Sequence, residues 1–253
     1  MTYQRTQREF TARKEEELAA GDELNALLAR SLPDLGRKWD NHLPVFLSAP
    51  SLARILWLDS IYRKALEVPG RVVEFGSQWG ASFNVLMLLK MIHEPWNASR
   101  QIISFSTFDQ GFVSVNSKDG PDAQVGDYAV AQGWSQALER ILQIHAARSP
   151  IGARENFRIV EGDVRETFPR WLDENPEALI SHAHFDMDVY EPTRDMLRLV
   201  LPRMPKGAIL VFDELNCPSF PGETQAVMEV LGVHGLALRK SSYQPYSAYC
   251  VIE

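Results

Sequence analysis

Residues 71–80 read RVVEFGSQWG, and this stretch decides the fold class. RVVEF is a short apolar run closed by Gly76, which is typical of a buried strand in a parallel sheet. The apolar stretch 81–92 follows at once and predicts a helix packed on that sheet. Gly76 permits a tight turn between them, and Gly80 allows the start of the helix to approach a ligand closely. We therefore expect a strand, a ligand-binding turn and a helix.

The same alternation extends in both directions from this stretch. Before it, residues 51–67 predict an amphipathic helix that Pro69 and Gly70 end. After it, apolar runs predict further strands at 101–108, 156–160, 183–186, 207–212, 236–239 and 248–252. Helical spacing predicts helices at 130–147, 165–172 (which Pro169 can interrupt), 192–201 and 223–231. The polar residues 112–128 predict a long loop.

Strands that alternate with helices imply an α/β fold, a doubly wound parallel sheet with helices on both faces. The last two predicted strands leave no room for a helix between them, so we expect an antiparallel hairpin at the sheet edge. A mostly parallel, seven-stranded sheet of this kind is the pattern of the Rossmann-like class I methyltransferase fold. Dinucleotide dehydrogenases, in contrast, usually stay parallel to the end.

The first 50 residues differ from the rest of the chain. Residues 11–32 have roughly helical spacing that Gly21 interrupts, and Asp22 can cap a second helix. Pro33, Pro44 and Pro50 predict an irregular approach to the main domain. We interpret 1–50 as a helical extension, either a cap over a sheet or partner surface or a lid over a substrate pocket, and 51–253 as the methyltransferase domain.

Composition restricts the possible partners. The formal net charge of −7 argues against a nucleic-acid partner. No apolar run approaches the roughly 20 residues of a membrane-spanning helix, so no membrane partner is expected. Residues 1–14 lack the apolar segment of a signal peptide, and Cys217 and Cys250 lack metal-site spacing. These features predict a cytoplasmic protein.

Ligands of such sheets bind beyond the carboxyl ends of the strands. Glu74, just before the glycine turn, can orient the turn and reach the amino group of a cofactor. Asp109 follows the second strand and can bind both hydroxyls of a ribose, although it can equally cap a helix. After the third strand, Asp163 can accept from an adenine amino group, although Gly162-Asp163 is also a common turn pair.

The fourth and fifth strands end in a concentration of acidic residues. Asp186 and Asp188 follow the fourth strand, and Asp213 and Glu214 follow the fifth. Neighbouring strand ends would bring all of these carboxylates together, where they repel one another unless a cation or protons neutralise them. Hard oxygen ligands suit Mg²⁺, Ca²⁺ or Mn²⁺. The alternative is that some of them cap helices or pair with Lys and Arg.

Taken together, these segments resemble the macrocin O-methyltransferase family, which methylates sugar hydroxyls of antibiotics. The resemblance covers roughly residues 50–230, and its most specific parts are VVEFGSQWGAS, STFDQGF, VEGDVRETFP, FDMDVYEPT and the strand 207–214. The family typically shows D-G-D-L-Y-E-x-T and a following pair of aspartates. This chain has Met187 in place of the glycine and Asp213-Glu214 as its acidic pair.

The resemblance implies an S-adenosylmethionine-dependent O-methyltransferase assisted by Mg²⁺ or another divalent cation. It assigns the metal to Asp186, Asp213 and Glu214, and the catalytic base to Asp186 or Asp188. The cofactor would be held by Glu74, Gly76, Ser77, Gly80, Ser82, Asp109, Gly162 and Asp163. The implied acceptor is a small-molecule glycoside with a deoxysugar such as rhamnose, and the implied assembly is a homo-oligomer.

Three alternatives remain at this point. A catechol or phenol presents the same pair of oxygens as a vicinal diol. An NAD-dependent oxidoreductase shares the strand–helix alternation, but the first turn lacks G-x-G-x-x-G. A non-catalytic binding protein on the same fold would not need the acid cluster. Of the remaining residues, His182 or His184 could line the pocket, and Trp79 lies inside the glycine turn.

Overall fold

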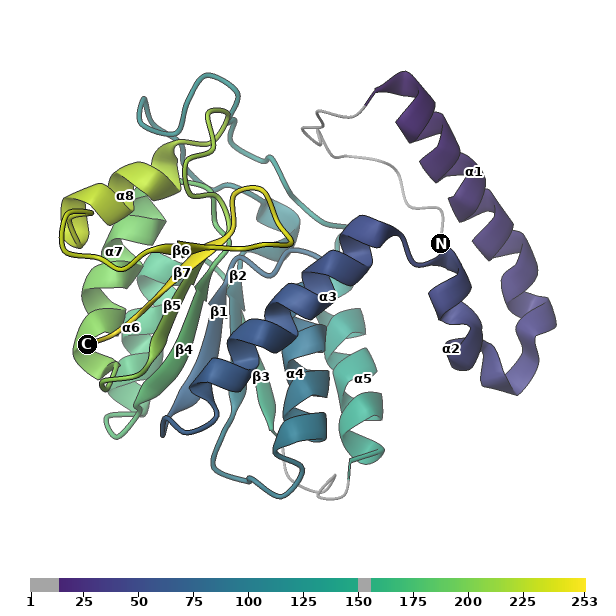
Figure 1. Cartoon of the computed structure of the whole chain (residues 1–253), viewed down its shortest axis with the longest axis horizontal. Helices are drawn as coiled ribbons and strands as arrows, with labels where there is room; N and C mark the ends of the chain where they lie inside the picture. Colours follow the sequence, from purple (N-terminus) through teal and green to yellow (C-terminus); the bar gives the residue numbers. More distant parts are fainter. Residues whose placement is uncertain (1–13, 150–155) are drawn as a thin grey trace.

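The computed structural model describes residues 14–149 and 156–253. At its centre is a seven-stranded sheet of order β3-β2-β1-β4-β5-β7-β6 (Figure 1). Its strands are β1 (Arg71–Phe75), β2 (Ile102–Ser106), β3 (Phe157–Glu161), β4 (Ile180–Phe185), β5 (Ile209–Phe212), β6 (Arg239–Lys240) and β7 (Ala248–Val251). β1 to β5 are parallel, and β7 runs antiparallel to both β5 and β6. The predicted doubly wound sheet with an antiparallel edge is therefore confirmed.

Helices cover both faces of the sheet (Figure 1). One face carries α3 (Ala49–Tyr62), α4 (Ala81–His93) and α5 (Trp134–Ala147). The other carries α6 (Val164–Glu174), α7 (Tyr190–Val200) and α8 (Gly222–Val230). Since successive strand residues point to opposite faces, β1 and β4 contribute Phe75 and Phe185 to the second face and Glu74 and His184 to the first. Titratable side chains are thus buried on the face that α3 helps to cover.

The core beneath α6 to α8 is rich in aromatic rings. Phe75, Phe105 and Phe168 are fully or almost fully buried and meet at centroid distances of 5.0 to 5.5 Å. Burial of each such ring contributes about 1.5–3 kcal/mol relative to exposure. Phe185 continues the stack to Phe212 on β5. These rings fix the positions of the strand ends, and therefore of the loops that follow them.

Two predictions about the N-terminal region are wrong. α1 (Glu15–Ser31) runs through Gly21 without a break, because an exposed helical glycine costs only about 1 kcal/mol. The prolines do not mark an irregular approach but lie in the first turns of helical segments, where their missing N–H is not needed. These segments are η1 (Leu32–Lys38), α2 (Trp39–His42), η2 (Leu43–Phe46) and α3. Residues 11–13 of the predicted helix lie outside the described part.

Smaller corrections concern element ends. α6 is continuous through Pro169, because its buried face, which includes Phe168 and Trp171, holds it against the sheet. α5 begins at Trp134 rather than at 130, after Gly133 in a left-handed conformation. β6 is a two-residue strand later than the predicted 236–239. The remaining short helices are η3 (Arg63–Ala65), η4 (Phe108–Gln110) and η5 (Leu201–Arg203).

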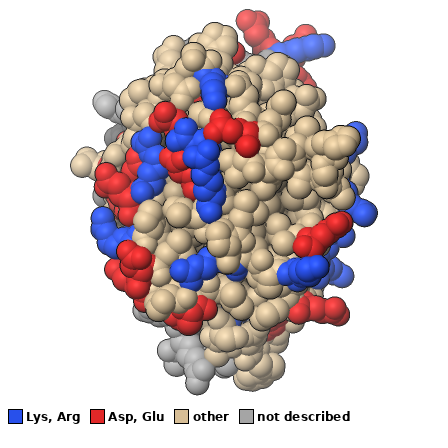
Figure 2. Space-filling model, turned by 90° about the vertical axis from the view of Figure 1, so that its left-hand side faces the viewer, with Lys and Arg blue, Asp and Glu red and all other residues tan. Residues whose placement is uncertain are grey.

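The N-terminal arm (residues 14–48) stands apart from the sheet at the right of Figure 1. None of the residues of α1 is buried. On the opposite side of the molecule, near α7 and α8, basic and acidic side chains intermix (Figure 2). Arg165 pairs there with Glu191, and Arg198 with Glu229. Within the described ranges, no helix has the length and apolarity needed to cross a membrane.

Candidate active site

A cavity of about 290 Å³ lies at the carboxyl ends of the strands, where the parallel sheet predicts it. The turn after β1, the start of α4 and the loops after β2, β3, β4 and β5 form its walls. Four non-glycine residues with positive φ line it, namely Gln78, Phe108, Tyr128 and Asp188. Such backbone strain tends to gather at functional sites. The cavity is therefore the candidate active site.

The glycine turn forms the floor of this cavity. Gly76 has φ +95°, and a Cβ there would lie 1.8 Å from the backbone oxygen of Asp186, so only glycine lets β1 and β4 approach this closely. Ser77 and Ser82 line the cavity, as does Trp79. Gly80 does not line it, and a Cβ there would meet the side chain of Leu138 on α5 at 2.4 Å. The second glycine therefore allows the close packing of α5, whereas its role in the approach of a ligand stays a prediction.

Glu74 is fully buried beneath the turn and does not line the cavity. Its Oε2 accepts a hydrogen bond from Ser77 Oγ, which lies 2.6 Å from Ser104 Oγ. Burial raises the pKa of the Glu74 carboxyl. Glu74 therefore supports the turn from below, as predicted, whereas its contact with a cofactor stays a prediction.

The acids after β2 and β3 have different positions. Asp109 is exposed in η4 and outside the cavity, because β2 ends three residues earlier at Ser106, which does line the cavity. Gly162 and Asp163 line the cavity. Asp163 also caps α6 by accepting from Arg165 N at 2.9 Å, and pairs with the Arg165 guanidinium at 2.6 Å. The helix-cap role that the sequence suggested as the alternative for Asp109 is thus found at Asp163 instead.

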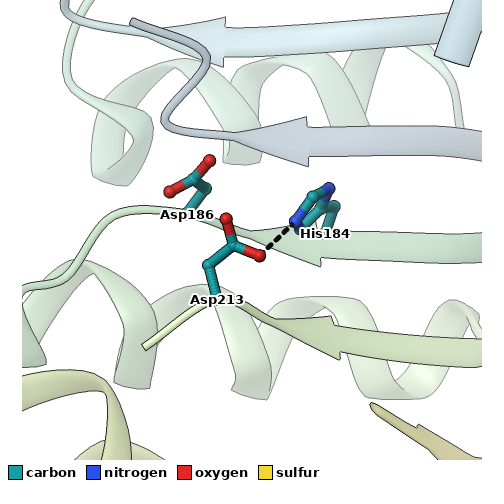
Figure 3. Close-up of side chains that lie close together, drawn as sticks. All are labelled: His184, Asp186 and Asp213. Atoms are coloured by element: carbon teal, nitrogen blue, oxygen red, sulfur yellow. Dashed lines mark hydrogen bonds and ion pairs between the residues drawn. The ribbon is translucent and has the colours of Figure 1, made fainter. Parts of the chain in front are cut away.

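The acids after β4 and β5 do converge. Asp186 and Asp213 lie side by side at the ends of these strands, and His184 on β4 points toward Asp213 (Figure 3). His184 Nε2 is 3.1 Å from Asp213 Oδ1, and one ligand atom from each of the three residues lies within 4.8 Å of the others. Asp188 and Glu214 line the cavity but are not part of this group.

Arg54 is the residue that sequence reasoning missed. Its Nη2 lies 3.1 Å from Asp186 Oδ2 and forms a second ion pair with Asp213 Oδ2. Ser82 Oγ accepts from Arg54 Nε and Nη2 at 3.2 and 2.9 Å. One signal was available: Arg54 shares the buried face of α3 with Leu58 and Ile61 at helical spacing. A basic residue on such a face needs a buried acidic partner.

The charges of the site are unequal. The pKa of Asp213 is held well below its usual value, because the charges of Arg54 and His184 outweigh the effect of burial. Burial and neighbouring acids raise the pKa of Asp186 and Asp188. Burial also raises the pKa of Glu214 to about 7, with a contribution from Asp213. These four acids outnumber Arg54, and their remaining oxygen atoms fit an additional hard cation, which would favour the deprotonated forms.

The outer wall of the cavity is the loop 112–128. Phe112 and Tyr128 pack with Phe220 and Cys217 in a separate small cluster. Asp119 is buried and joins this loop to α7: its Oδ1 accepts from Tyr190 N at 2.5 Å, and its Oδ2 from Asn116 N at 2.6 Å. The predicted long loop is thus a fixed wall.

A parallel sheet with an antiparallel edge and a cavity at its glycine turn defines a class I methyltransferase. Residues 73–215 match the family described as methyltransferase domain, and the chain belongs to this family. This assignment makes the protein an enzyme and removes the oxidoreductase alternative. The narrower resemblance to the macrocin family stays a prediction.

Solved structures agree with this assignment. The chain is 37% identical to CalS11, calicheamicin methyltransferase, with a TM-score of 0.90 over 99% of this chain and 98% of that chain. An apo structure of CalS11, described as a TDP-rhamnose 3'-O-methyltransferase of calicheamicin biosynthesis, gives 34% identity and a TM-score of 0.83 over 96% of both chains. The O-methyltransferase NovP, 17% identical with a TM-score of 0.58 over 79% of this chain and 80% of that chain, shares the fold. Curated protein sequences gave no match.

Proposed function

We propose that this protein transfers a methyl group from S-adenosylmethionine to a sugar hydroxyl of a natural product, with the assistance of a divalent cation. The observation that carries the proposal is the convergence of Asp186 and Asp213 beside the glycine turn. The similarity to CalS11, described as acting on TDP-rhamnose, supports a deoxysugar such as rhamnose as the acceptor and a place in antibiotic biosynthesis. The resemblance to the macrocin family points to the same class of acceptor.

The cofactor would bind along the turn after β1. S-adenosylmethionine supplies the methyl group on a sulfonium that reacts in line with the acceptor oxygen. Gly76, Ser77 and Ser82 offer backbone and hydroxyl groups on the cavity wall, and Gly162 and Asp163, directly after β3, offer backbone and carboxyl groups. Ser106 at the end of β2 is better placed than the exposed Asp109 to meet a ribose. These residues hold both reactants in contact, which can supply much of the rate acceleration.

The acid cluster would hold the cation and remove the proton. Asp186, Asp213 and Glu214 would be its ligands, and a bound cation lowers the pKa of the hydroxyl groups it contacts. Asp188 lines the cavity, and its raised pKa makes it a stronger base than an ordinary aspartate. Asp186 remains the other candidate base, although Arg54 already engages one of its oxygens.

Asp186→Asn and Asp213→Asn test the proposal directly. With TDP-rhamnose and S-adenosylmethionine, mass spectrometry should detect a methylated sugar for the parent protein and at least about a hundredfold less for either variant. Their affinity for S-adenosylhomocysteine, measured by calorimetry, should change less than about threefold, because neither carboxylate forms the glycine turn. Asp173→Asn, an exposed aspartate on α6, is the matched control.

Two outcomes would contradict parts of the proposal. Full activity in excess chelator would contradict the role of the divalent cation in the reaction. Turnover of a catechol in preference to every sugar nucleotide would replace the acceptor class and leave the methyl transfer intact.

A further inference from the structure

We infer that Arg54 is a resident counter-ion of the acid pair, which a divalent cation must displace in order to bind between Asp186 and Asp213. The inference rests on the cation of the proposed function. In the described structure, Arg54 Nη2 contacts one oxygen of each carboxylate, and these are Oδ2 in both cases. The guanidinium therefore lies between the two groups that the acid cluster would present to a metal.

Geometry makes the two occupants mutually exclusive at these oxygens. Mg²⁺ requires oxygen ligands at about 2.0–2.1 Å in a near-octahedral arrangement. Asp213 Oδ1 is already engaged by His184 Nε2 at 3.1 Å and Ser247 Oγ at 3.2 Å, so Oδ2 is the oxygen left for a cation. Arg54 holds that oxygen. A cation that bound there would meet a second positive charge within contact distance, and one of them has to leave.

The position of Arg54 is built into the fold. Leu58 and Ile61, on the same face of α3, are completely buried and fix the helix against the sheet. Ser82, at the start of α4, accepts two hydrogen bonds from the guanidinium and sets its direction. About a fifth of the Arg54 side chain, 22%, stays exposed, so the guanidinium has a route away from the acids. α3 precedes residues 73–215, so Arg54 lies outside the segment that matches the methyltransferase family.

Occupancy by Arg54 has two consequences. Without metal, Arg54 partly neutralises the acid pair and offsets the repulsion between Asp186 and Asp213. With metal, part of the binding free energy is used to displace Arg54, so the measured metal affinity is lower than the acids alone would give. A guanidinium that merely braced the ligands would have the opposite effect, because its removal would loosen the site and weaken metal binding.

Metal titration of the full chain distinguishes these roles. Calorimetry with Mn²⁺ at one pH and ionic strength should give a dissociation constant at least about tenfold lower for Arg54→Gln than for the parent protein. Arg63→Gln, an exposed arginine at the end of α3 that pairs with Asp59, should leave the constant unchanged. An unchanged or higher constant for Arg54→Gln would overturn the inference.

Thermal unfolding in excess chelator gives a readout without metal. Arg54→Gln should lower Tm, because the acids lose their counter-ion, and the double variant Arg54→Gln/Asp186→Asn should recover most of the loss. Arg54→Lys, which keeps the charge, provides a folded comparison if the glutamine variant is too unstable. A Tm equal to that of the parent protein would reject the counter-ion. If neither the parent protein nor the variants bind Mn²⁺, both the displacement of Arg54 and the metal site are contradicted. Sugar methylation in excess chelator would then show that the proposed methyl transfer takes place without the cation.

Discussion

The carboxyl groups of the buried cluster around Asp213 have pKa values that are shifted in opposite directions. The pKa of Asp213 is kept low by Arg54 and His184, whereas burial raises the pKa of Asp188 and Glu223. Pairs of acids whose environments push their pKa values apart are a common basis for separate catalytic roles. Asp213, which stays deprotonated, is therefore suited to bind a cation, and Asp188 is suited to accept a proton.

Glu214 makes the site sensitive to pH in the neutral range. Its carboxyl has a pKa of about 7, above the usual 4.5, so the folded protein binds the proton more tightly than the unfolded chain does. The free energy of unfolding of the metal-free protein therefore falls as pH rises from about 4.5 through 7. A metal ligand must be deprotonated, so metal affinity should instead rise by up to about tenfold between pH 6 and pH 8.

Calorimetry with Mn²⁺ at pH 6 and pH 8 checks this expectation. Glu214→Gln removes the titrating group and should flatten the pH dependence, in addition to weakening binding at pH 8. Glu166→Gln, on α6, is a control with the same chemical change at a distance from the acids. If the Mn²⁺ affinity of Glu214→Gln depended on pH as strongly as that of the parent protein, another acid would be the titrating group.

Individual residues differ in how far the sequence predicts them. Asp186 and Asp213 could be found because each directly follows a strand, and parallel strands end at one edge. Arg54 and Asp119 belong to a helix and a loop that reach the site only through packing, so the helical spacing could indicate a buried acidic partner for Arg54 but not which acids it meets. Asp109 lies outside the cavity because β2 ends at Ser106 and the chain turns into η4 before reaching it, so its contact with a cofactor stays a prediction.

Among the elements, the loop 112–128 is the one that we expect to shape the acceptor pocket. It lines the cavity with Phe112 and Tyr128 and is joined to the N-terminus of α7 by Asp119. A carboxylate is favoured at this position because it accepts from a backbone N–H where the helix dipole is positive. The helix that it contacts directly follows Asp186 and Asp188. The loop and the acid cluster are therefore fixed relative to each other.

Asp119→Ala should loosen this wall without changing the glycine turn. We expect the acceptor KM to rise about five- to fiftyfold, because two backbone N–H groups lose their buried partner and the loop no longer shapes the pocket. The dissociation constant of S-adenosylhomocysteine should stay within about threefold. Steady-state kinetics and calorimetry measure the two quantities. Asp122→Ala, in the same loop, is the control, and an equal rise in its KM would contradict a specific role of Asp119.

Elements were predictable where periodicity and burial coincide. The buried strand β5 is a uniform apolar run, and β1 is one apart from Arg71 and Glu74. The absence of space for a helix before β7 implied the antiparallel edge. Prediction failed where one residue was taken as decisive. Gly21 and Pro169 are tolerated inside α1 and α6, since the cost of one unfavourable residue is small beside the hydrogen bonds and packing of a whole helix.

At the scale of the whole molecule, none of the described residues 14–48 of the N-terminal arm is buried, although Asp40 pairs with Arg148 after α5. α1 has 17 residues and buries none of them, and isolated helices of about this length are only marginally stable in water. Large apolar side chains along the arm and the start of α3 are exposed, namely Leu18, Leu32, Trp39, Val45, Leu47, Leu52 and Leu56. A row of exposed apolar side chains of this kind marks a contact surface. We therefore propose that the arm joins copies of this chain into a homo-oligomer.

Removal of residues 1–46 tests this proposal and leaves Ser48, which caps α3, in place. Light scattering after size exclusion should give an oligomer for the full chain and a smaller species for the truncated one. Trp39→Ala with Val45→Ser should shift the same equilibrium without shortening the chain, because both side chains are exposed in the single chain and would be buried only between copies. Leu179→Ser, an exposed leucine before β4, is the matched control.

Since the arm adds no residue to the cavity walls, S-adenosylhomocysteine should still bind the truncated protein. A full chain that is monomeric at about 50 μM, well above the dissociation constants of stable dimers, would contradict the proposal and leave a cap over the sheet or a lid over the pocket as the interpretations of the arm.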